Sequence, residues 1–302
     1  MSIAFFKGTF VSLKEANINI RTHAFNYGTG VFEGIRGYYC ENQKQMFLFR
    51  VEDHYERMRK NSRIVHIDIE RSSEELIEIT KELIKRNNFK CDIYIRPIAY
   101  KSAGKLGVSF PRDHELCIYI IETESVDIPD KPVRSCVSSW RRTDDNMIPG
   151  SAKITGAYVN SALAATEARD NGFDEALLLN QDGHVSEAST MNLFMLKNKM
   201  LCTPATSHNI LPGITRDSVI EMSRRELDLD TIERPISRTE LYFAEEVFLC
   251  STMREILSVG SIDNKTINGG EIGGVTKQLQ TLFHEIVRAK NKKFKKWLTP
   301  VY

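Results

Sequence analysis

Residues 150–158 read GSAKITGAY and contain one lysine, Lys153, among small residues. A lysine in a loop is usually an exposed residue without a special role. Here the glycines at positions 150 and 156 allow another group to approach the backbone closely, and a helical pattern over residues 156–169 begins just after the lysine. This setting makes Lys153 a candidate for an amine that takes part in catalysis.

Two features further along the chain supply complementary chemistry. Glu187 comes at the end of a strand-like segment, residues 184–186, where the ordinary interpretation is a surface charge. Residues 211–217 (LPGITRD) are typical of a loop that leads into a helix, with Thr215 as the expected N-cap. Pyridoxal phosphate needs an amine for its aldehyde, a carboxylate for its pyridine nitrogen and a helix start for its phosphate. If one site unites the three, the chain is an enzyme of amino-acid chemistry.

The composition argues against several other classes of protein. The 302 residues are 41% hydrophobic and 27% charged, which is typical of a soluble globular protein. The net charge of +1 gives no electrostatic reason to expect nucleic acid or an anionic membrane as a partner. Residues 1–8 break too early for a signal peptide, and no apolar run is long enough to span a membrane. Six separated cysteines without a C-x-x-C pair predict free thiols in a reducing cytoplasm and no metal site.

Hydrophobic patterns predict an α+β protein of two domains. In the first half we expect strands at residues 46–49, 93–100 and 116–121, a helix at 52–61, and a second helix opened by a Ser72/Glu75 capping box. Residues 122–132 are polar, contain two prolines and are interpreted as a linker. We therefore place a small N-terminal domain at residues 1–127 and a larger C-terminal domain at residues 128–302.

Hairpin signals in the second half favour α+β over a doubly wound parallel sheet. Residues 181–183 and 197–199 each separate two short apolar strands. Strands are also expected at residues 133–140 and 245–251. Helices are expected at 156–169, 216–227 and 275–289, and the basic residues 290–296 are interpreted as a solvated tail.

Taken together, seven segments resemble a class IV pyridoxal-phosphate aminotransferase, and most of all the branched-chain amino acid aminotransferases. The resemblance extends from about residue 24 to residue 276, and the segments are residues 23–28, 31–36, 94–97, 153–161, 172–176, 211–216 and 245–248. It implies the two-domain fold of type IV pyridoxal-phosphate enzymes, with a small N-terminal α/β domain and a larger C-terminal domain with a β-barrel-like core. In this family the domains enclose the cofactor, and subunits pair as homodimers or as higher assemblies of dimers.

The resemblance also implies a role for each site residue. Lys153 is the Schiff-base lysine and proton shuttle, Tyr158 binds the ring hydroxyl, and Glu187 pairs with the pyridine nitrogen. The remaining cofactor-binding residues hold the phosphate or pack on the ring, and they are Arg57, Leu211, Gly213, Ile214, Thr215 and Thr252. The substrate-binding residues form an apolar pocket with one arginine for the distal carboxylate of glutamate, and they are Tyr27, Phe32, Gly34, Tyr94, Arg96, Val108 and Met253. Val108 belongs to a loop at residues 104–108 that resembles the one reaching the partner's site.

The implied reaction is transamination of leucine, isoleucine or valine with 2-oxoglutarate. Met253-Arg254 and Ser189-Thr190-Met191 are bulkier than is usual in the family, which leaves the exact substrate open. The alternatives on the same fold are a D-amino-acid or R-selective amine transaminase and an aminodeoxychorismate-type lyase. A scaffold protein that has lost activity is a fourth possibility, which an absence of yellow cofactor colour would favour.

Overall fold

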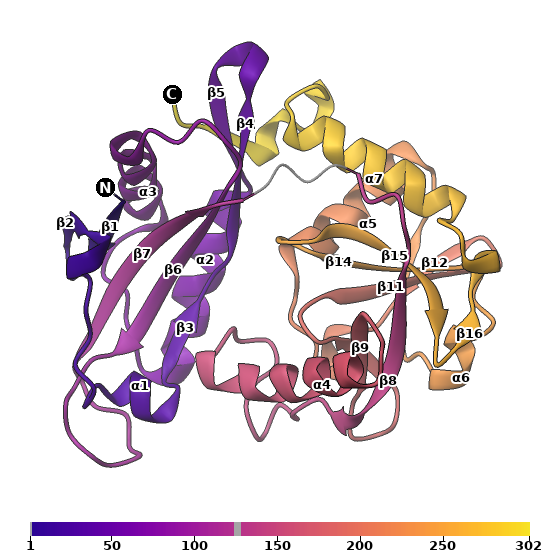
Figure 1. Cartoon of the computed structure of the whole chain (residues 1–302), viewed down its shortest axis with the longest axis horizontal. Helices are drawn as coiled ribbons and strands as arrows, with labels where there is room; N and C mark the ends of the chain where they lie inside the picture. Colours follow the sequence, from indigo (N-terminus) through magenta and orange to yellow (C-terminus); the bar gives the residue numbers. More distant parts are fainter. Residues whose placement is uncertain (1, 124–127) are drawn as a thin grey trace. The chain divides into compact units, whose positions relative to one another are not determined.

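A computed structural model of the chain describes residues 2–123 and 128–302 (Figure 1). The chain divides into two compact units. The first consists of Met1–Ser125, Ala152–Gly156 and Glu285–Tyr302, and the second of Val126–Ser151 and Ala157–His284. The segment that carries Lys153 therefore belongs to the first unit. The domain boundary predicted between residues 127 and 128 falls at the edge of residues 124–127, outside the described part of the chain, and stays a prediction.

An antiparallel sheet forms the core of the first unit. The strand order is β17-β5-β4-β6-β7-β1-β2, and β3 pairs with β6. The longest pair is β6 with β7, in register from Ile93 opposite Glu122 to Lys101 opposite His114. The strands are β1 (Ile3–Phe6), β2 (Thr9–Ser12), β3 (Gly30–Phe32), β4 (Ile35–Cys40), β5 (Gln45–Phe49), β6 (Ile93–Lys101), β7 (His114–Glu122) and β17 (Leu298–Pro300).

Three helices accompany this sheet, and their starts follow local sequence signals. They are α1 (His23–Tyr27), α2 (Val51–Ser62) and α3 (Ser73–Asn87). The predicted capping box of α3 is confirmed, because the Ser72 hydroxyl accepts from the Glu75 N–H at 3.2 Å and the Ser72 N–H donates to the Glu75 carboxylate at 2.7 Å. Satisfying these otherwise unpaired helix donors is worth about 1 kcal/mol per cap.

A mixed sheet forms the core of the second unit. Its order is β10-β9-β8-β15-β14-β11-β12-β13, and β16 pairs with β15. The strand β8 runs parallel to β9 and β15, and β12 runs parallel to β13, whereas the other pairs are antiparallel. The strands are β8 (Val133–Arg141), β9 (Glu175–Leu179), β10 (Val185–Ala188), β11 (Asn192–Lys197), β12 (Met200–Thr203), β13 (Thr231–Glu233), β14 (Glu246–Ser251), β15 (Glu255–Ile262) and β16 (Lys265–Thr266).

The hairpins and helices of this unit confirm the α+β prediction. Both predicted hairpins are present, as β9 with β10 and β11 with β12. The helix predicted at 156–169 is a short 3-10 turn, Thr155–Ala157, followed by α4 (Tyr158–Asp170), which packs on β8 and β9. The other helices are α5 (Ile214–Glu226), α6 (Arg238–Leu241) and α7 (Gly274–Val287). Within the described residues, no helix has the length and apolarity that crossing a membrane requires.

Candidate active site

Backbone contacts hold the segment of Lys153 against β3 in the first unit. The Phe32 N–H donates to the Lys153 carbonyl at 3.1 Å, and the Gly156 N–H donates to the Gly28 carbonyl at 2.9 Å. Gly28 has a φ of 66°, and a Cβ there would lie 2.7 Å from the Gly156 Cα. Only glycine tolerates both conditions. The main chain therefore positions Lys153 whatever its side chain does.

The Lys153 side chain lies over the ring of Phe32, which also contacts Arg96. Its Nζ lies 5.1 Å from the centre of the Phe32 ring, and the Arg96 guanidinium lies 4.3 Å from the same ring. The prediction that Tyr94 and Arg96 share a face of their strand is confirmed, because Arg96 Nη2 donates to the Tyr94 hydroxyl at 2.9 Å. Gly34 is needed here, since a Cβ would lie 2.0 Å from the Tyr94 hydroxyl.

Arg96 keeps unused donor capacity in this cluster. Among the described residues, its buried Nε has no hydrogen-bond partner. A buried guanidinium N–H left without an acceptor is costly, and a substrate carboxylate would remove that cost. The geometry therefore suits the predicted role of Arg96 as a carboxylate receptor.

The structure adds a buried carboxylate, Glu33, that the sequence analysis missed. Its side chain is 0% exposed, and it accepts from Arg57 Nε at 2.7 Å, from Arg57 Nη2 at 2.7 Å and from His54 Nδ1 at 2.8 Å. His54 and Arg57 are three residues apart on α2, so they lie on one helix face. This three-residue spacing was the one feature of the sequence that could have indicated a shared partner for His54 and Arg57. One edge of the Arg57 guanidinium is thus fixed by Glu33, while its predicted phosphate contact stays a prediction.

This cluster changes the proton affinity of its members. Burial alone would raise the pKa of the Glu33 carboxyl, but the charge of Arg57 and the hydrogen bonds from His54 and Arg57 outweigh burial and hold that pKa well below its usual range. Burial lowers the pKa of His54 and outweighs the opposing hydrogen bond to Glu33. At neutral pH the cluster therefore contains a carboxylate, a guanidinium and a neutral imidazole.

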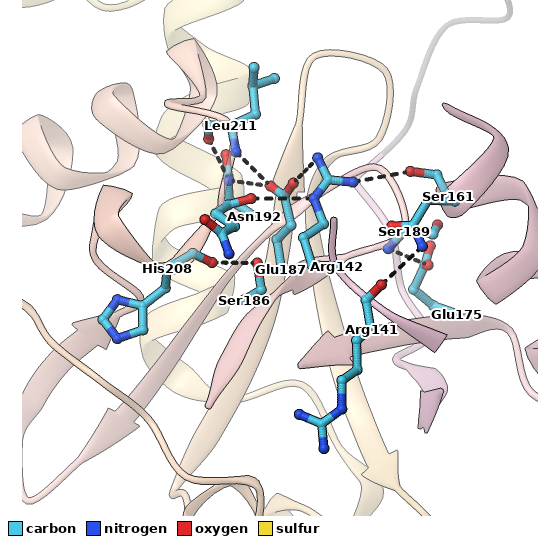
Figure 2. Close-up of polar contacts among 12 residues, drawn as sticks. Arg141, Arg142, Ser161, Glu175, Ser186, Glu187, Ser189, Asn192, His208 and Leu211 are labelled. Atoms are coloured by element: carbon cyan, nitrogen blue, oxygen red, sulfur yellow. Dashed lines mark hydrogen bonds and ion pairs between the residues drawn. The ribbon is translucent and has the colours of Figure 1, made fainter. Parts of the chain in front are cut away.

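Glu187 lies in a second buried network, in the second unit (Figure 2). It is the third residue of β10, so the strand continues one residue beyond the end that was predicted at Glu187. Its side chain is only 4% exposed, and its carboxylate accepts from Arg142 Nη2 at 2.8 Å, from Asn192 Nδ2 at 3.0 Å and from the Leu211 N–H at 3.2 Å. Pairing with a guanidinium stabilises the charged form of a buried carboxylate. The expected alternative, an exposed surface charge, is therefore excluded.

Arg142 and Asn192 had escaped the sequence analysis. Arg142 directly follows β8, and besides Glu187 it contacts the Ser161 hydroxyl at 3.4 Å and the Asn209 carbonyl at 3.3 Å. Asn192 is the first residue of β11. The proximity of Arg142 to Glu187 depends on the strand order of the sheet, whereas Asn192 follows Glu187 by five residues, across the short connection between β10 and β11.

The helix α5 begins earlier than the sequence indicated. Its N-cap is Gly213 and not Thr215, because the Gly213 carbonyl accepts the first helical bond, from the Asp217 N–H at 3.0 Å. A Cβ at Gly213 would lie 2.0 Å from Asn192 Oδ1, so a larger capping residue has no room there. Thr215 is 3% exposed inside the first turn. The N–H groups of residues 215 and 216 precede the first helical bond, and N–H groups at such a helix start can bind an anion.

The structure describes the other predicted site residues as follows, each inside its own unit. The Tyr27 hydroxyl accepts from the Gly107 N–H at 3.3 Å, and Val108 next to that contact is 80% exposed. Tyr158 is the first residue of α4. Thr252 follows the end of β14, and Met253 after it is 37% exposed. None of these positions tests the role in cofactor or substrate binding that was predicted for the residue, so each role stays a prediction.

The groups present match the chemistry of pyridoxal phosphate. Taken by itself, the first unit holds an amine on a fixed backbone segment. Taken by itself, the second unit holds a buried carboxylate paired with Arg142 and the N-terminus of a 13-residue helix. These suit an aldehyde, a pyridinium nitrogen and a phosphate, respectively. Within the described residues, no group of three or more histidine, cysteine or acidic side chains could hold a metal ion.

Comparison with known proteins supports the same conclusion. The family model described as Amino-transferase class IV matches residues 30–262. The probable branched-chain-amino-acid aminotransferase of Aquifex aeolicus is 48% identical over 303 residues, covering 100% of this chain and 97% of that protein. The branched-chain-amino-acid aminotransferase of Escherichia coli K12 is 34% identical, covering 98% and 96%.

Solved structures of branched-chain aminotransferases superpose on this chain over its full length. The branched-chain amino acid aminotransferase from Thermobaculum terrenum, in its PLP-form, superposes with a TM-score of 0.93 at 34% identity, covering 100% of this chain and 98% of that one. The branched-chain aminotransferase of Thermoproteus uzoniensis with norvaline gives 0.93 at 37% identity, covering 99% of each chain. Similarity at this level, over whole chains, confirms the predicted class IV fold.

Proposed function

Because the chain belongs to the class IV aminotransferases, we propose that it transfers the amino group of L-leucine, L-isoleucine or L-valine to 2-oxoglutarate. The products are the branched-chain 2-oxo acids and L-glutamate. The observation that carries the proposal is full-length similarity to branched-chain aminotransferases, in sequence and in fold. The cluster of Phe32, Tyr94 and Arg96 supports it, because it combines apolar rings with one carboxylate receptor.

Pyridoxal phosphate is the cofactor in this proposal, and when bound it supplies an electron sink that makes the Cα–H of an amino acid acidic. Lys153 Nζ would take the proton from the substrate Cα and hold it for return. Glu187 would hold a proton on the pyridine nitrogen through an ionic hydrogen bond. The phosphate would be bound and the ring held by Arg57, Tyr158, Leu211, Gly213, Ile214, Thr215 and Thr252.

The substrate pocket in this proposal accepts two unlike side chains. A leucine side chain would contact the apolar faces of Tyr27, Phe32 and Tyr94, whereas the distal carboxylate of glutamate would bind Arg96. Gly34, Val108 and Met253 would complete the lining. The Cα–H chemistry is the same for both substrates, so selectivity depends on these side-chain contacts.

A half-reaction measured by absorbance tests the proposed function. Purified holoprotein is mixed separately with L-leucine, L-glutamate and D-alanine, without an acceptor. We expect L-leucine and L-glutamate, but not D-alanine, to convert the bound cofactor from its aldehyde to its amine form. Conversion by D-alanine alone would favour a D-amino-acid transaminase, and release of pyruvate without a keto-acid acceptor would favour a lyase. Protein that binds no pyridoxal phosphate at all would contradict the proposal.

Replacing Arg96 by alanine should separate the two substrates. We expect kcat/KM for L-glutamate to fall about 10- to 100-fold, because a charge-assisted hydrogen bond is lost, while kcat/KM for L-leucine changes only a few-fold. The matched control is Arg86→Ala, which removes a guanidinium from an exposed ion pair with Glu82 in the same unit. Equal losses for leucine and glutamate would show that Arg96 does not receive the distal carboxylate.

We further propose a cytoplasmic homodimer, or a higher assembly of dimers, with a role in branched-chain amino acid biosynthesis. All six cysteines are unpaired, as expected for a reducing compartment. The partly exposed apolar side chains Trp140, Val159 and Leu163 line a hollow along α4, a surface that a second copy would cover. Sedimentation at equilibrium tests the assembly, and a monomer at micromolar concentration would contradict it.

A further inference from the structure

Asn192 connects three groups of the buried network in the second unit. Figure 2 shows its side chain between Glu187 and Leu211. Its Nδ2 donates to Glu187 Oε2 at 3.0 Å and to the Leu211 carbonyl at 2.9 Å, and the Leu211 N–H donates to the same Oε2 at 3.2 Å. A carboxamide has two N–H hydrogens, so these two bonds use both.

The oxygen of the same amide faces the start of α5. The space that a Cβ would need at Gly213 is taken by Asn192 Oδ1, which would lie 2.0 Å from it. Gly213 is the N-cap, and Ile214 and Thr215 follow it as the first helical residues. A single side chain, only 6% exposed, therefore contacts both the buried carboxylate and the beginning of the helix.

We infer that Asn192 is a positioning residue that sets the separation between the Glu187 carboxylate and the N-terminus of α5. The inference rests on the proposed function, in which the carboxylate and the helix start bind opposite ends of one rigid cofactor. A rigid ligand realises its full affinity only if both protein groups are held at the matching distance.

One backbone group, the Leu211 N–H, contacts the Glu187 carboxylate directly, and the Asn192 amide adds a bond to each side of that contact. Glu187 lies in β10, whereas Leu211 and Gly213 lie in the loop before α5. Asn192 begins β11, and its opposite neighbour in the sheet is Cys250 of β14. The amide thus extends from a fixed strand and holds both the loop and the carboxylate.

The first test replaces the amide by a carboxylate of the same shape. Asn192→Asp removes both N–H donors and brings a like charge beside Glu187. Apoprotein of the full chain is titrated with pyridoxal phosphate and followed by cofactor absorbance. We expect the Kd to rise about 10- to 100-fold, the effect of losing hydrogen bonds to a charged group.

The control makes the same chemical change at an exposed amide. Asn171 Nδ2 donates to the Glu167 carbonyl at 2.8 Å at the end of α4, away from the network. Asn171→Asp should leave the Kd of pyridoxal phosphate unchanged. Urea unfolding is measured for both variants, because a lower midpoint with an unchanged Kd would mean a merely structural role for Asn192 and would overturn the inference.

A double-mutant cycle keeps the inference testable if Asn192→Asp fails to fold. Gly213→Ala directs a methyl group at Asn192 Oδ1, whereas Asn192→Ala removes that obstacle. We expect Gly213→Ala to raise the Kd about tenfold in the natural background and clearly less in the Asn192→Ala background, because contacting residues couple. Additive effects would overturn the inference.

The measured affinities for pyridoxal phosphate distinguish a failure of this inference from a failure of the proposed function. If the natural protein binds no pyridoxal phosphate, the proposed function is wrong. If the natural protein binds it, and Asn192→Asp binds it as tightly as Asn171→Asp does, only the positioning role of Asn192 is wrong.

Discussion

Lys153→Ala is expected to slow the conversion of bound cofactor by L-leucine about 10⁴-fold, the upper range for loss of a positioned acid–base group. The amine that moves the proton is removed, while the hydrogen bond from the Phe32 N–H to the Lys153 carbonyl is a main-chain contact that alanine keeps. The fold of the segment should therefore survive. The measurement is single-turnover absorbance, with cofactor binding checked separately.

A control variant and a rescue experiment test whether the loss of rate is specific to the Lys153 amine. Lys277→Ala, at an exposed position in the first turn of α7, should react at the natural rate. Added methylamine should restore part of the Lys153→Ala rate, because a small amine can enter the space left by the side chain and accept the proton. A Lys153→Ala variant that converts cofactor at the natural rate would assign the proton transfer to another group.

Glu33→Gln is expected to lower the free energy of unfolding by about 3–5 kcal/mol, the usual loss when one partner is removed from a buried ion pair. The substitution preserves shape but leaves the Arg57 charge buried beside a neutral amide. Urea denaturation at pH 7 measures the effect. Glu82→Gln is the control, because its pair with Arg86 is exposed on both sides and should contribute less than about 0.5 kcal/mol.

The pH dependence of stability provides a second measurement on the same variant. The pKa of Glu33 is lower in the folded than in the unfolded chain, so its contribution is present above the ordinary value of 4.5 and is lost as the pH falls below it. The pKa of His54 is also lowered, so protonation favours the unfolded chain as the pH falls through its ordinary value of 6.5. Both groups predict loss of stability in acid.

In Glu33→Gln the part of this loss that belongs to the carboxylate should disappear. The variant should therefore lose less stability than the natural protein between about pH 5 and pH 3, an interval that brackets the ordinary carboxyl value. A variant that is as stable at pH 7 and as acid-sensitive as the natural protein would contradict the assignment of Glu33 as a buried structural anion.

Local patterns in the sequence predicted the five longer helices and about half of the strands, whereas β1 to β4, β13 and β15 to β17 were not predicted. The Ser72/Glu75 capping box, the two hairpins and the shared face of Tyr94 and Arg96 depend on residues a few positions apart. Such signals follow from helix and strand periods and from turn chemistry, which act within one element. The segment of Lys153 and the helix start after residue 211 were recognisable in the same way.

Contacts between distant residues were decided only by the tertiary structure. Glu33 pairs with His54 and Arg57 across 21 and 24 residues, and Arg142, which directly follows β8, pairs with Glu187 of β10 in the same sheet. No helix or strand period relates these positions, because strand order and loop paths bring them together. A sequence pattern alone therefore left their partners open.

The start of α5 shows most clearly which features the sequence determined and which the tertiary structure decided. The sequence by itself determined that a helix follows the loop at residues 211–215, and it predicted Thr215 as the N-cap of a helix at residues 216–227. In the tertiary structure the N-cap is Gly213, and Asn192 Oδ1 occupies the space that any side chain would need at that position, so the residue there must be glycine. Threonine and glycine differ by only about a few tenths of a kcal/mol as N-caps, so tertiary contacts are enough to decide between the two positions.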